Sequence, residues 1–249
     1  MAHPPPPRDL QPLALWRHFP ARPCLLCGLR STSGGLCGLC RQALGPRPGC
    51  VRCPRCALAL PPLALLACPD CGAGQVSLCS TVAAFDYEHP GDMLIHGLKI
   101  SHQLEVAPAL AELMVDQWRR CGPGLGPDAW VIPVPPRPQA LRRRGFSPSA
   151  VLARRVARLL GLRMRPGVVR WAGARDLAQK RLGRQARRAA MRAAFVTADG
   201  LRGRELLLVD DVLTTGATLD ALARACRTAG ARSVHALVAA RAPWTVAVP

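Results

Sequence analysis

The chain has 249 residues, of which 34 are Lys or Arg and 15 are Asp or Glu, so its formal net charge is +19. Hydrophobic residues make up 49% of the sequence, which excludes a wholly disordered chain. No apolar run reaches the roughly 18 residues that a transmembrane helix needs, so the sequence predicts no membrane span.

The first 22 residues form a proline-rich segment that contains four consecutive prolines at residues 4–7. The segment lacks the basic start and apolar core of a secretory signal peptide, so we expect a cytoplasmic protein. Changes in composition divide the rest of the chain into two predicted domains. A cysteine-rich unit occupies residues 23–79, and an α/β unit occupies residues 80–249.

Cysteines dominate the first of these units, with ten of the twelve lying between Cys24 and Cys79. A two-residue gap between cysteines lets one tight turn supply two thiolates to a tetrahedral zinc ion, so four such pairs suffice for two ions. Because every ligand would be a thiolate, no position is left for water, and the two predicted Zn²⁺ sites are structural. The pairs are Cys24/Cys27, Cys37/Cys40, Cys53/Cys56 and Cys68/Cys71.

An iron–sulfur cluster and a disulfide framework are the alternatives for these cysteines. Evenly spaced pairs favour zinc over an iron–sulfur cluster, and a disulfide framework needs an oxidising compartment that nothing in the N-terminal segment indicates. The simplest assignment is sequential, with the first four cysteines on one ion and the next four on the other. An interleaved assignment is the alternative.

After Ser80 the pattern changes to apolar strands that alternate with amphipathic helices. We expect strands at residues 81–87, 129–134, 168–171, 206–209 and 233–239. We expect helices at residues 91–99, 106–119, 147–160 and 219–228, and a Ser-Pro start at Ser147 suits the beginning of the third. Strands alternating with helices predict an α/β fold, a parallel sheet flanked by helices.

Positive charge is concentrated within this unit. Residues 137–192 contain 17 basic groups and one acidic group, whereas residues 1–125 contain 11 basic and 8 acidic groups. A stretch of this density forms either a solvated basic face or a surface for polyanions such as nucleic acid or phosphorylated substrates. Its part at residues 176–194 fits a helix or a loop.

The strongest functional signal is the segment LLVDDVLTTGAT at residues 207–218. An apolar strand delivers two carboxylates, Asp210 and Asp211, at its C-terminal end, where open α/β sheets bind ligands. Backbone N–H groups of the following turn and helix start suit a phosphate, and carboxylates suit sugar hydroxyls. The segment therefore predicts a ribose 5-phosphate site, whose phosphate would bind at Thr214, Thr215, Gly216, Ala217 and Thr218.

This segment resembles the 5-phosphoribosyl-1-pyrophosphate motif of type I phosphoribosyltransferases, and most of the chain is similar to the ComF/GntX-like family. The resemblance rests on the Cys-x-x-Cys front and on Phe85–Tyr87, Leu98–Lys99, Val131–Pro135, Arg144–Phe146, Gln179 with Arg187, and Ala194–Phe195. It implies a double zinc ribbon followed by a type I phosphoribosyltransferase-like domain. Some family members are associated with natural competence, the uptake and processing of DNA.

The resemblance also implies roles for individual residues. Asp210 and Asp211 would contact the ribose 2′- and 3′-hydroxyls, and residues 214–218 would hold the 5′-phosphate. Val134, Pro135 and Arg137, in the turn at Pro133–Arg137, would face the pyrophosphate.

Cations would neutralise the departing diphosphate, with Arg144 and Arg187 as the candidates beside Arg142 and Arg143. Mg²⁺ would bridge the pyrophosphate and the ribose hydroxyls of the donor. The chain departs from the family at two positions: Ser147 replaces the usual Asn after Arg144–Phe146, and Ala190 replaces the Asn expected three residues beyond Arg187. These departures concern the acceptor side rather than the sugar phosphate.

Three functions fit these features. The first is a phosphoribosyltransferase that uses phosphoribosyl pyrophosphate and an acceptor that the sequence does not identify. The second is a nucleic-acid-binding accessory protein that uses the zinc ribbons and the basic stretch, with DNA or a DNA-processing protein as its partner. The third is a sensor that binds the donor without catalysis.

Overall fold

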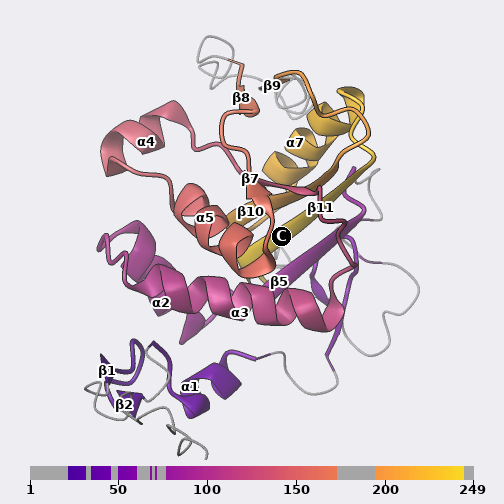
Figure 1. Ribbon diagram of the computed structural model, residues 1–249. Coiled ribbons are helices and arrows are strands. Elements are labelled where there is room, and N and C mark those ends of the chain that lie inside the picture. Colours follow the sequence, from indigo (N-terminus) through magenta and orange to yellow (C-terminus); the bar gives the residue numbers. More distant parts are fainter. Residues whose placement is uncertain are drawn as a thin grey trace, which may run out of the picture.

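The computed structural model has a five-stranded parallel sheet at its centre, in the order β5-β11-β10-β6-β7 (Figure 1). The strands are β5 (Ser80–Asp86), β6 (Trp130–Pro133), β7 (Arg163–Met164), β10 (Glu205–Leu213) and β11 (Ser233–Arg241). β10 and β11 are almost wholly buried because helices or loops cover both faces, which explains their continuous apolar sequences. The structure describes residues 22–31, 35–45, 50–60, 68, 71, 77–172 and 194–243.

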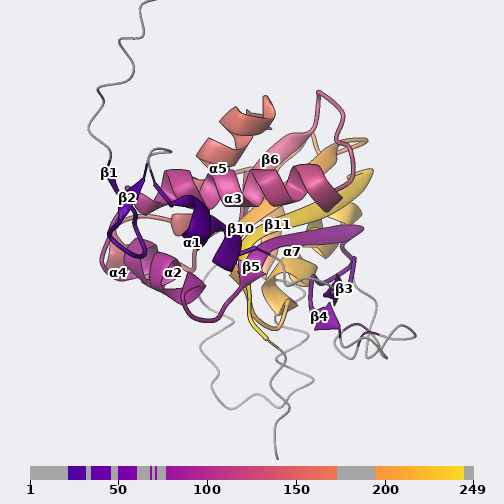
Figure 2. The same cartoon turned by 90° about the horizontal axis from the view of Figure 1, so that it is seen from below.

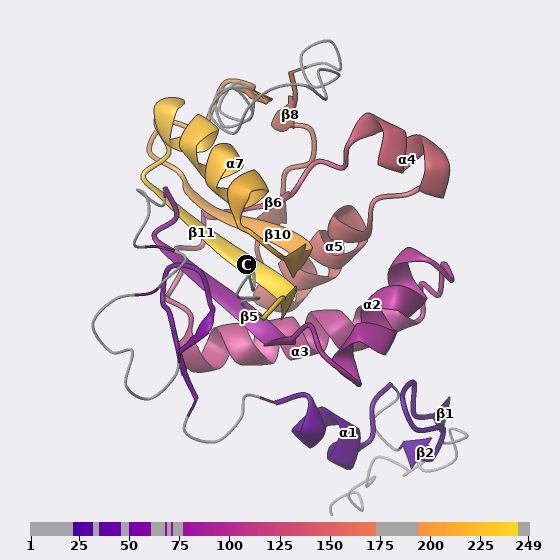
Figure 3. The same ribbon diagram turned by 180° about the vertical axis from the view of Figure 1, so that it is seen from behind.

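Helices cover both faces of the sheet, and each face has its own core (Figures 1 and 3). The helices α2 (Gly91–Lys99), α3 (Val106–Cys121) and α5 (Pro148–Leu160) pack on one face, and α7 (Ala217–Thr228) packs on the other. Leu98, Leu110 and Leu152 belong to the first core, whereas Leu219 and Leu222 belong to the second.

The connections make β6 and β10 the topological switch point of the sheet. β6 leads through α5 to β7 on one side, and β10 leads through α7 to β11 on the other. The two helices therefore leave neighbouring strand ends toward opposite faces. Open α/β sheets bind their ligands beyond the carboxyl ends of the strands at such a point.

The cysteine-rich segment forms two small units on opposite faces of the sheet (Figure 2). Leu36 and Leu44 of the first unit join the core under α2 and α3, whereas Ala57 and Leu78 join the core on the side of α7. The first unit contains β1 (Arg22–Pro23), β2 (Arg30–Ser31) and α1 (Gly38–Ala43), and the second contains β3 (Val51–Arg52) and β4 (Ala59–Leu60).

Two further features lie outside the parallel sheet. β8 (Val169–Trp171) pairs antiparallel with β9 (Phe195–Thr197), and α4 (Pro138–Arg144) connects β6 to α5 without burying any residue. Most of the basic segment predicted at residues 176–194, and the proline-rich segment up to residue 21, lie outside the described residues.

The structure confirms the predicted α/β class and parallel sheet. Ser147 caps α5 as expected, because its Oγ accepts a hydrogen bond from the Ala150 N–H at 3.2 Å. The sequence missed α4 because α4 has no apolar stripe, and it missed β7 and β9 because strands of two or three residues show no periodicity. None of the helices in the described part of the chain has the length and apolar character to cross a bilayer.

Candidate functional site

Asp210 and Asp211 are consecutive residues of β10, next to the switch point. β10 continues beyond them to Leu213, because its ladder with β11 extends to the pair Leu213 and Arg241. The predicted strand at residues 206–209 is therefore too short, and the acids lie within the strand. Asp210 Oδ1 accepts a hydrogen bond from the Asp211 N–H at 2.9 Å. The Asp211 side chain in turn accepts one from the Val212 N–H at 2.7 Å.

Lys99, the last residue of α2, contacts this pair directly. Its Nζ lies 2.7 Å from Asp211 Oδ1, and the Lys99 and Asp211 side chains are 23% and 10% exposed. The sequence placed Lys99 in the family resemblance but not in the site, because no local pattern shows that the end of α2 reaches β10. A cation at this position offsets part of the charge of two adjacent carboxylates.

The protonation of Asp210 differs from that of an exposed aspartate. Burial raises the pKa of Asp210 well above its usual value of 3.8, and the charge of Asp211 raises it further. The Asp211 N–H and Lys99 act in the opposite direction without cancelling these effects. A ligand that donates hydrogen bonds to the carboxylate would favour its ionised form.

The phosphate turn, residues 214–218, leads from β10 directly into α7. Gly216 is the N-cap of α7 with φ +75°, a left-handed conformation that glycine adopts without strain. Within the described part of the chain, no protein group accepts a hydrogen bond from the backbone N–H of Thr215 or Gly216. The turn therefore offers open donors at the positive end of a 12-residue helix, which suits a phosphate.

The turn after β6 lies next to the acids because β6 pairs with β10. The Val134 N–H donates to the Val209 carbonyl at 2.9 Å, directly before Asp210. The Pro135 carbonyl accepts a hydrogen bond from Trp171 Nε1 at 2.8 Å, and the exposed Arg137 guanidinium lies 5.7 Å from the centre of the Trp171 ring. The structure thus brings this predicted turn to the same edge of the sheet.

The arginines predicted to neutralise the departing diphosphate lie on α4 or outside the described residues. Arg142 and Arg143 are exposed on α4, and Arg144 is half-buried in its last turn. In the part of the chain that the structure covers, no hydrogen bond or ion pair joins Arg144 to the acids or to the phosphate turn. Arg187 lies outside the described residues.

Sequence reasoning also missed Arg241, which ends β11 and is only 2% exposed. Its Nη1 donates to the carbonyl oxygens of Thr214 at 2.6 Å and Leu213 at 3.3 Å. A charged residue at the end of a mostly apolar strand was the available signal for this position.

The eight paired cysteines form two clusters, in the sequential arrangement. The first cluster is Cys24, Cys27, Cys37 and Cys40, and the second is Cys53, Cys56, Cys68 and Cys71; within each, all sulfur atoms lie within 4.8 Å of one another. All twelve cysteines of the chain are described, and no disulfide joins any of them.

The size of each cluster fits a tetrahedral metal ion. The Sγ atoms of Cys27 and Cys37 lie 3.7 Å apart, and in the second cluster the Cys53–Cys71 and Cys56–Cys68 separations are 3.8 and 3.5 Å. A tetrahedron with zinc–sulfur bonds of about 2.3 Å has sulfur–sulfur edges of about 3.8 Å. Either cluster therefore has the donors and the dimensions for zinc.

The electrostatics of the clusters also favour a cation. Burial and the neighbouring thiols raise the pKa of Cys40 to about 12. In the second cluster, burial and the Cys68 thiol raise the pKa of Cys56 to about 12. In the first, burial opposes ionisation of Cys24, but backbone N–H groups lower its pKa to about 6. Four thiolates at this separation repel one another, and a divalent cation removes that repulsion.

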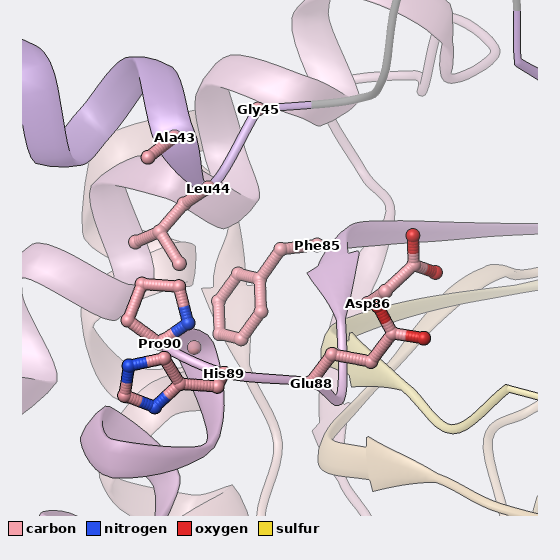
Figure 4. A pocket seen from close by; sticks show the side chains of 9 residues that line it. Ala43, Leu44, Gly45, Phe85, Asp86, Glu88, His89 and Pro90 are labelled. Atoms are coloured by element: carbon pink, nitrogen blue, oxygen red, sulfur yellow. The ribbon is translucent and has the colours of Figure 1, made fainter.

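A small cavity lies between α1 and the turn from β5 to α2 (Figure 4). Its walls include Leu44, Phe85 and Pro90, whose side chains face one another, and its volume is about 60 Å³. Neither Asp210 and Asp211 nor residues 214–218 line it, so it is separate from the candidate site. It lies where the first cysteine unit packs against the end of β5 and the start of α2.

Comparisons with known proteins agree with this architecture. Residues 142–247 match the family model described as phosphoribosyl transferase domain. The chain is 31% identical over 220 residues to DNA utilization protein YhgH of Salmonella typhi, a match that covers 82% of this chain and 96% of that protein. It is 28% identical over 229 residues to Competence protein F of Haemophilus influenzae, with 88% and 96% covered.

Among solved structures, the chain is similar to a purine phosphoribosyltransferase from Pyrococcus horikoshii. The two are 20% identical, the TM-score is 0.33, and the match covers 60% of this chain and 79% of that one.

Proposed function

The chain belongs to the ComF/GntX-like family, and from that premise we propose that it binds 5-phosphoribosyl-1-pyrophosphate and transfers the phosphoribosyl group to an acceptor. The observation that carries the proposal is the continuity of Asp210, Asp211 and the phosphate turn at the switch point of the sheet. The zinc-binding unit would be residues 23–79 and the transferase unit residues 80–249. Reducing cytoplasm would keep the cysteine ligands available for zinc.

Each part of the site would bind one part of the donor. The Asp210 and Asp211 carboxylates would accept hydrogen bonds from the ribose 2′- and 3′-hydroxyls. The open N–H groups of Thr215 and Gly216 would donate to the 5′-phosphate, with the start of α7 adding its positive potential. Lys99 would hold Asp211 in place, because its Nζ already lies 2.7 Å from Oδ1.

Transfer would break the bond between ribose C1 and the pyrophosphate oxygen while the acceptor nucleophile bonds to C1. Pyrophosphate would depart with the bonding electron pair, so its stabilisation is the main electrostatic task. The turn of Val134, Pro135 and Arg137 would face it. Carboxylate oxygens such as those of Asp210 and Asp211 suit Mg²⁺, which when bound with the donor would neutralise pyrophosphate charge.

Calorimetric titration of the zinc-loaded chain with phosphoribosyl pyrophosphate and Mg²⁺ tests binding. We expect saturable binding that Asp210→Asn combined with Asp211→Asn weakens by at least about a hundredfold, because two charge-assisted hydrogen bonds are lost. Asp199→Asn, at an exposed aspartate, is the matched control. A wild-type chain that does not bind the donor at millimolar concentration would overturn the proposal. Release of pyrophosphate with candidate nucleobases then separates an enzyme from a sensor.

Nucleic-acid binding is a second candidate function, favoured by exposed arginines and by the names of the relatives. Among the described residues of the basic stretch, the exposed arginines are Arg137, Arg142, Arg143, Arg154, Arg158, Arg163, Arg165 and Arg170. We expect affinity for single-stranded DNA to fall steeply with salt, and Arg142→Gln with Arg143→Gln to reduce the slope by about one unit or more. Arg120→Gln, at an exposed arginine outside both the basic stretch and the zinc ribbons, is the control. Affinity that does not depend on salt would contradict this function.

A further inference from the structure

Arg241 connects two parts of the molecule that the sequence separates widely. On one side its Nη1 donates to the carbonyl oxygen of Thr214 at 2.6 Å, at the start of the phosphate turn. On the other side its Nε donates to the carbonyl oxygen of Cys56, a member of the second cluster, at 3.0 Å. The side chain is 2% exposed, so these contacts form away from solvent.

The second cluster is also fixed to the sheet beside Arg241. Arg52 forms a bidentate pair with Asp86, with both N–O distances at 2.9 Å, and Asp86 is the β5 residue in register with Arg241. The Pro54 and Arg55 carbonyls accept hydrogen bonds from the Thr81 N–H and hydroxyl at 2.8 and 2.6 Å. The tight turn between Cys53 and Cys56 is therefore anchored at both ends of β5.

The contact with Thr214 acts on the group that would bind phosphate. The Thr214 carbonyl and the Thr215 N–H belong to one planar trans peptide, in which they point in opposite directions. A guanidinium that holds the carbonyl therefore also directs the Thr215 N–H, one of the open donors of the turn. This peptide turns about the torsions of Thr214 and Thr215, which are both exposed, so side-chain packing does not otherwise fix its orientation.

We propose that Arg241 is a positioning residue that couples metal occupancy of the second cluster to the orientation of the phosphate turn. The ligand class, a phosphate monoester of ribose, rests on the proposed function. The first cluster has no such connection in the described part of the chain: Arg41 docks it on Glu112 and Asp116 of α3. The coupling thus belongs to one cluster of the two.

NMR relaxation of the full-length, zinc-loaded chain without donor tests the coupling, because the order parameter of the Thr215 N–H reports how firmly its peptide is held even when the N–H has no acceptor. Arg241→Lys keeps the positive charge but loses the fork of donors that reaches both carbonyls, and we expect this order parameter to fall from a rigid value of about 0.85 to below about 0.6. Arg41→Lys makes the same change at the other cluster, and the Thr215 order parameter should stay within about 0.1 of wild type. A wild-type order parameter in a folded Arg241→Lys chain, or an equal loss in both variants, would overturn the inference.

Metal-ligand variants extend the test if Arg241→Lys fails to fold. Cys68→Ser and Cys37→Ser should each lower the measured zinc content by one ion per chain, but only Cys68→Ser should lower the Thr215 order parameter. A loss in both variants or in neither would overturn the inference. The readout needs no donor, so it stands even if the wild-type chain binds no phosphoribosyl pyrophosphate, a result that would overturn the proposed function alone.

Discussion

Each of the two cysteine clusters begins with a tight turn, or knuckle, and the two knuckles have the same geometry. In the first, the Gly28 N–H donates to the Cys24 carbonyl at 2.9 Å, and in the second the Ala57 N–H donates to the Cys53 carbonyl at 2.8 Å. Both residues after the knuckle have positive φ, +72° for Gly28 and +56° for Ala57. The local geometry that presents the first two thiolates is therefore the same in both clusters.

The clusters differ in how they attach to the rest of the chain. The first attaches through Arg41, whose partners Glu112 and Asp116 have side chains 42% and 41% exposed. The second attaches through Arg52 and Asp86, which are 14% and 20% exposed, and through the buried Arg241. The ion pairs that attach the first cluster are thus exposed, whereas those of the second are mostly buried and lie beside the arginine that supports the candidate site.

Loss of a metal ion should have the largest effect on stability and donor binding, and this effect should differ between the two clusters. Cys56→Ser is expected to lower the free energy of unfolding by about 4 kcal/mol and to weaken donor binding by about tenfold or more, because the support of Arg241 is lost. Cys27→Ser, in the first cluster, should leave donor affinity within about twofold of wild type. Zinc content, denaturant unfolding and calorimetry measure these effects. Equal losses of donor affinity would contradict the division of roles.

The next largest difference is expected between Arg52 and Arg41, the arginines that attach the two clusters, in what their loss costs in free energy of unfolding. Arg52→Met leaves Asp86 without its partner in a mostly buried position, and we expect the free energy of unfolding to fall by about 3 kcal/mol. Arg41→Met breaks exposed pairs, so its cost should be about 1 kcal/mol or less. Urea denaturation of both variants measures the difference. Similar costs would show that the two attachments are equally strong.

Lowering the pH should weaken donor binding at the site that the second cluster supports. The pKa of Asp210 is raised above 3.8 mainly by burial and by Asp211, and donor hydroxyls need its ionised form. Donor affinity should therefore fall as pH drops through this raised pKa, by up to about tenfold per unit. Stability of the free chain has the opposite sign, because neutral Asp210 is favoured in the folded state and this contribution is lost as pH rises through the same pKa.

Titrations of donor binding at several pH values above 5, with zinc content checked at each, measure the first effect. Asp210→Asn should flatten the profile as well as weaken binding. A wild-type affinity that stays constant over this whole pH range would contradict this account of Asp210.

Much of the fold was predictable because its signals are local. The helix at residues 91–99 has an apolar stripe, and the strands that form β10 and β11 are continuous apolar runs, so periodicity and length identify them. The succession of a strand with two acids, a glycine-containing turn and a helix was also predictable, because one contiguous segment contains it. Cysteine spacing predicted the two clusters for the same reason.

The contributions of Lys99 and Arg241 were not predictable, because each depends on contacts between distant segments. Lys99 reaches Asp211 only because α2 packs beside the central strands, and Arg241 reaches Cys56 only because the second cluster docks against β5. The placement of the clusters on opposite faces follows from the same tertiary contacts. No spacing rule in the cysteine segment contains that information.

The smallest expected effect concerns the two residues after the knuckles. Gly28→Ala forces a side chain into a left-handed conformation where a Cβ meets no atom within 4 Å, so its cost should be the backbone term alone, about 1 kcal/mol. Ala57→Gly relieves the same strain, but Ala57 is 1% exposed, and removing its buried methyl costs about 0.8 kcal/mol. The two terms nearly cancel, so Ala57→Gly should unfold within about 0.5 kcal/mol of wild type. Denaturant unfolding measures both variants, and a clear gain in stability for Ala57→Gly would show that its methyl contributes little to the core beside α7.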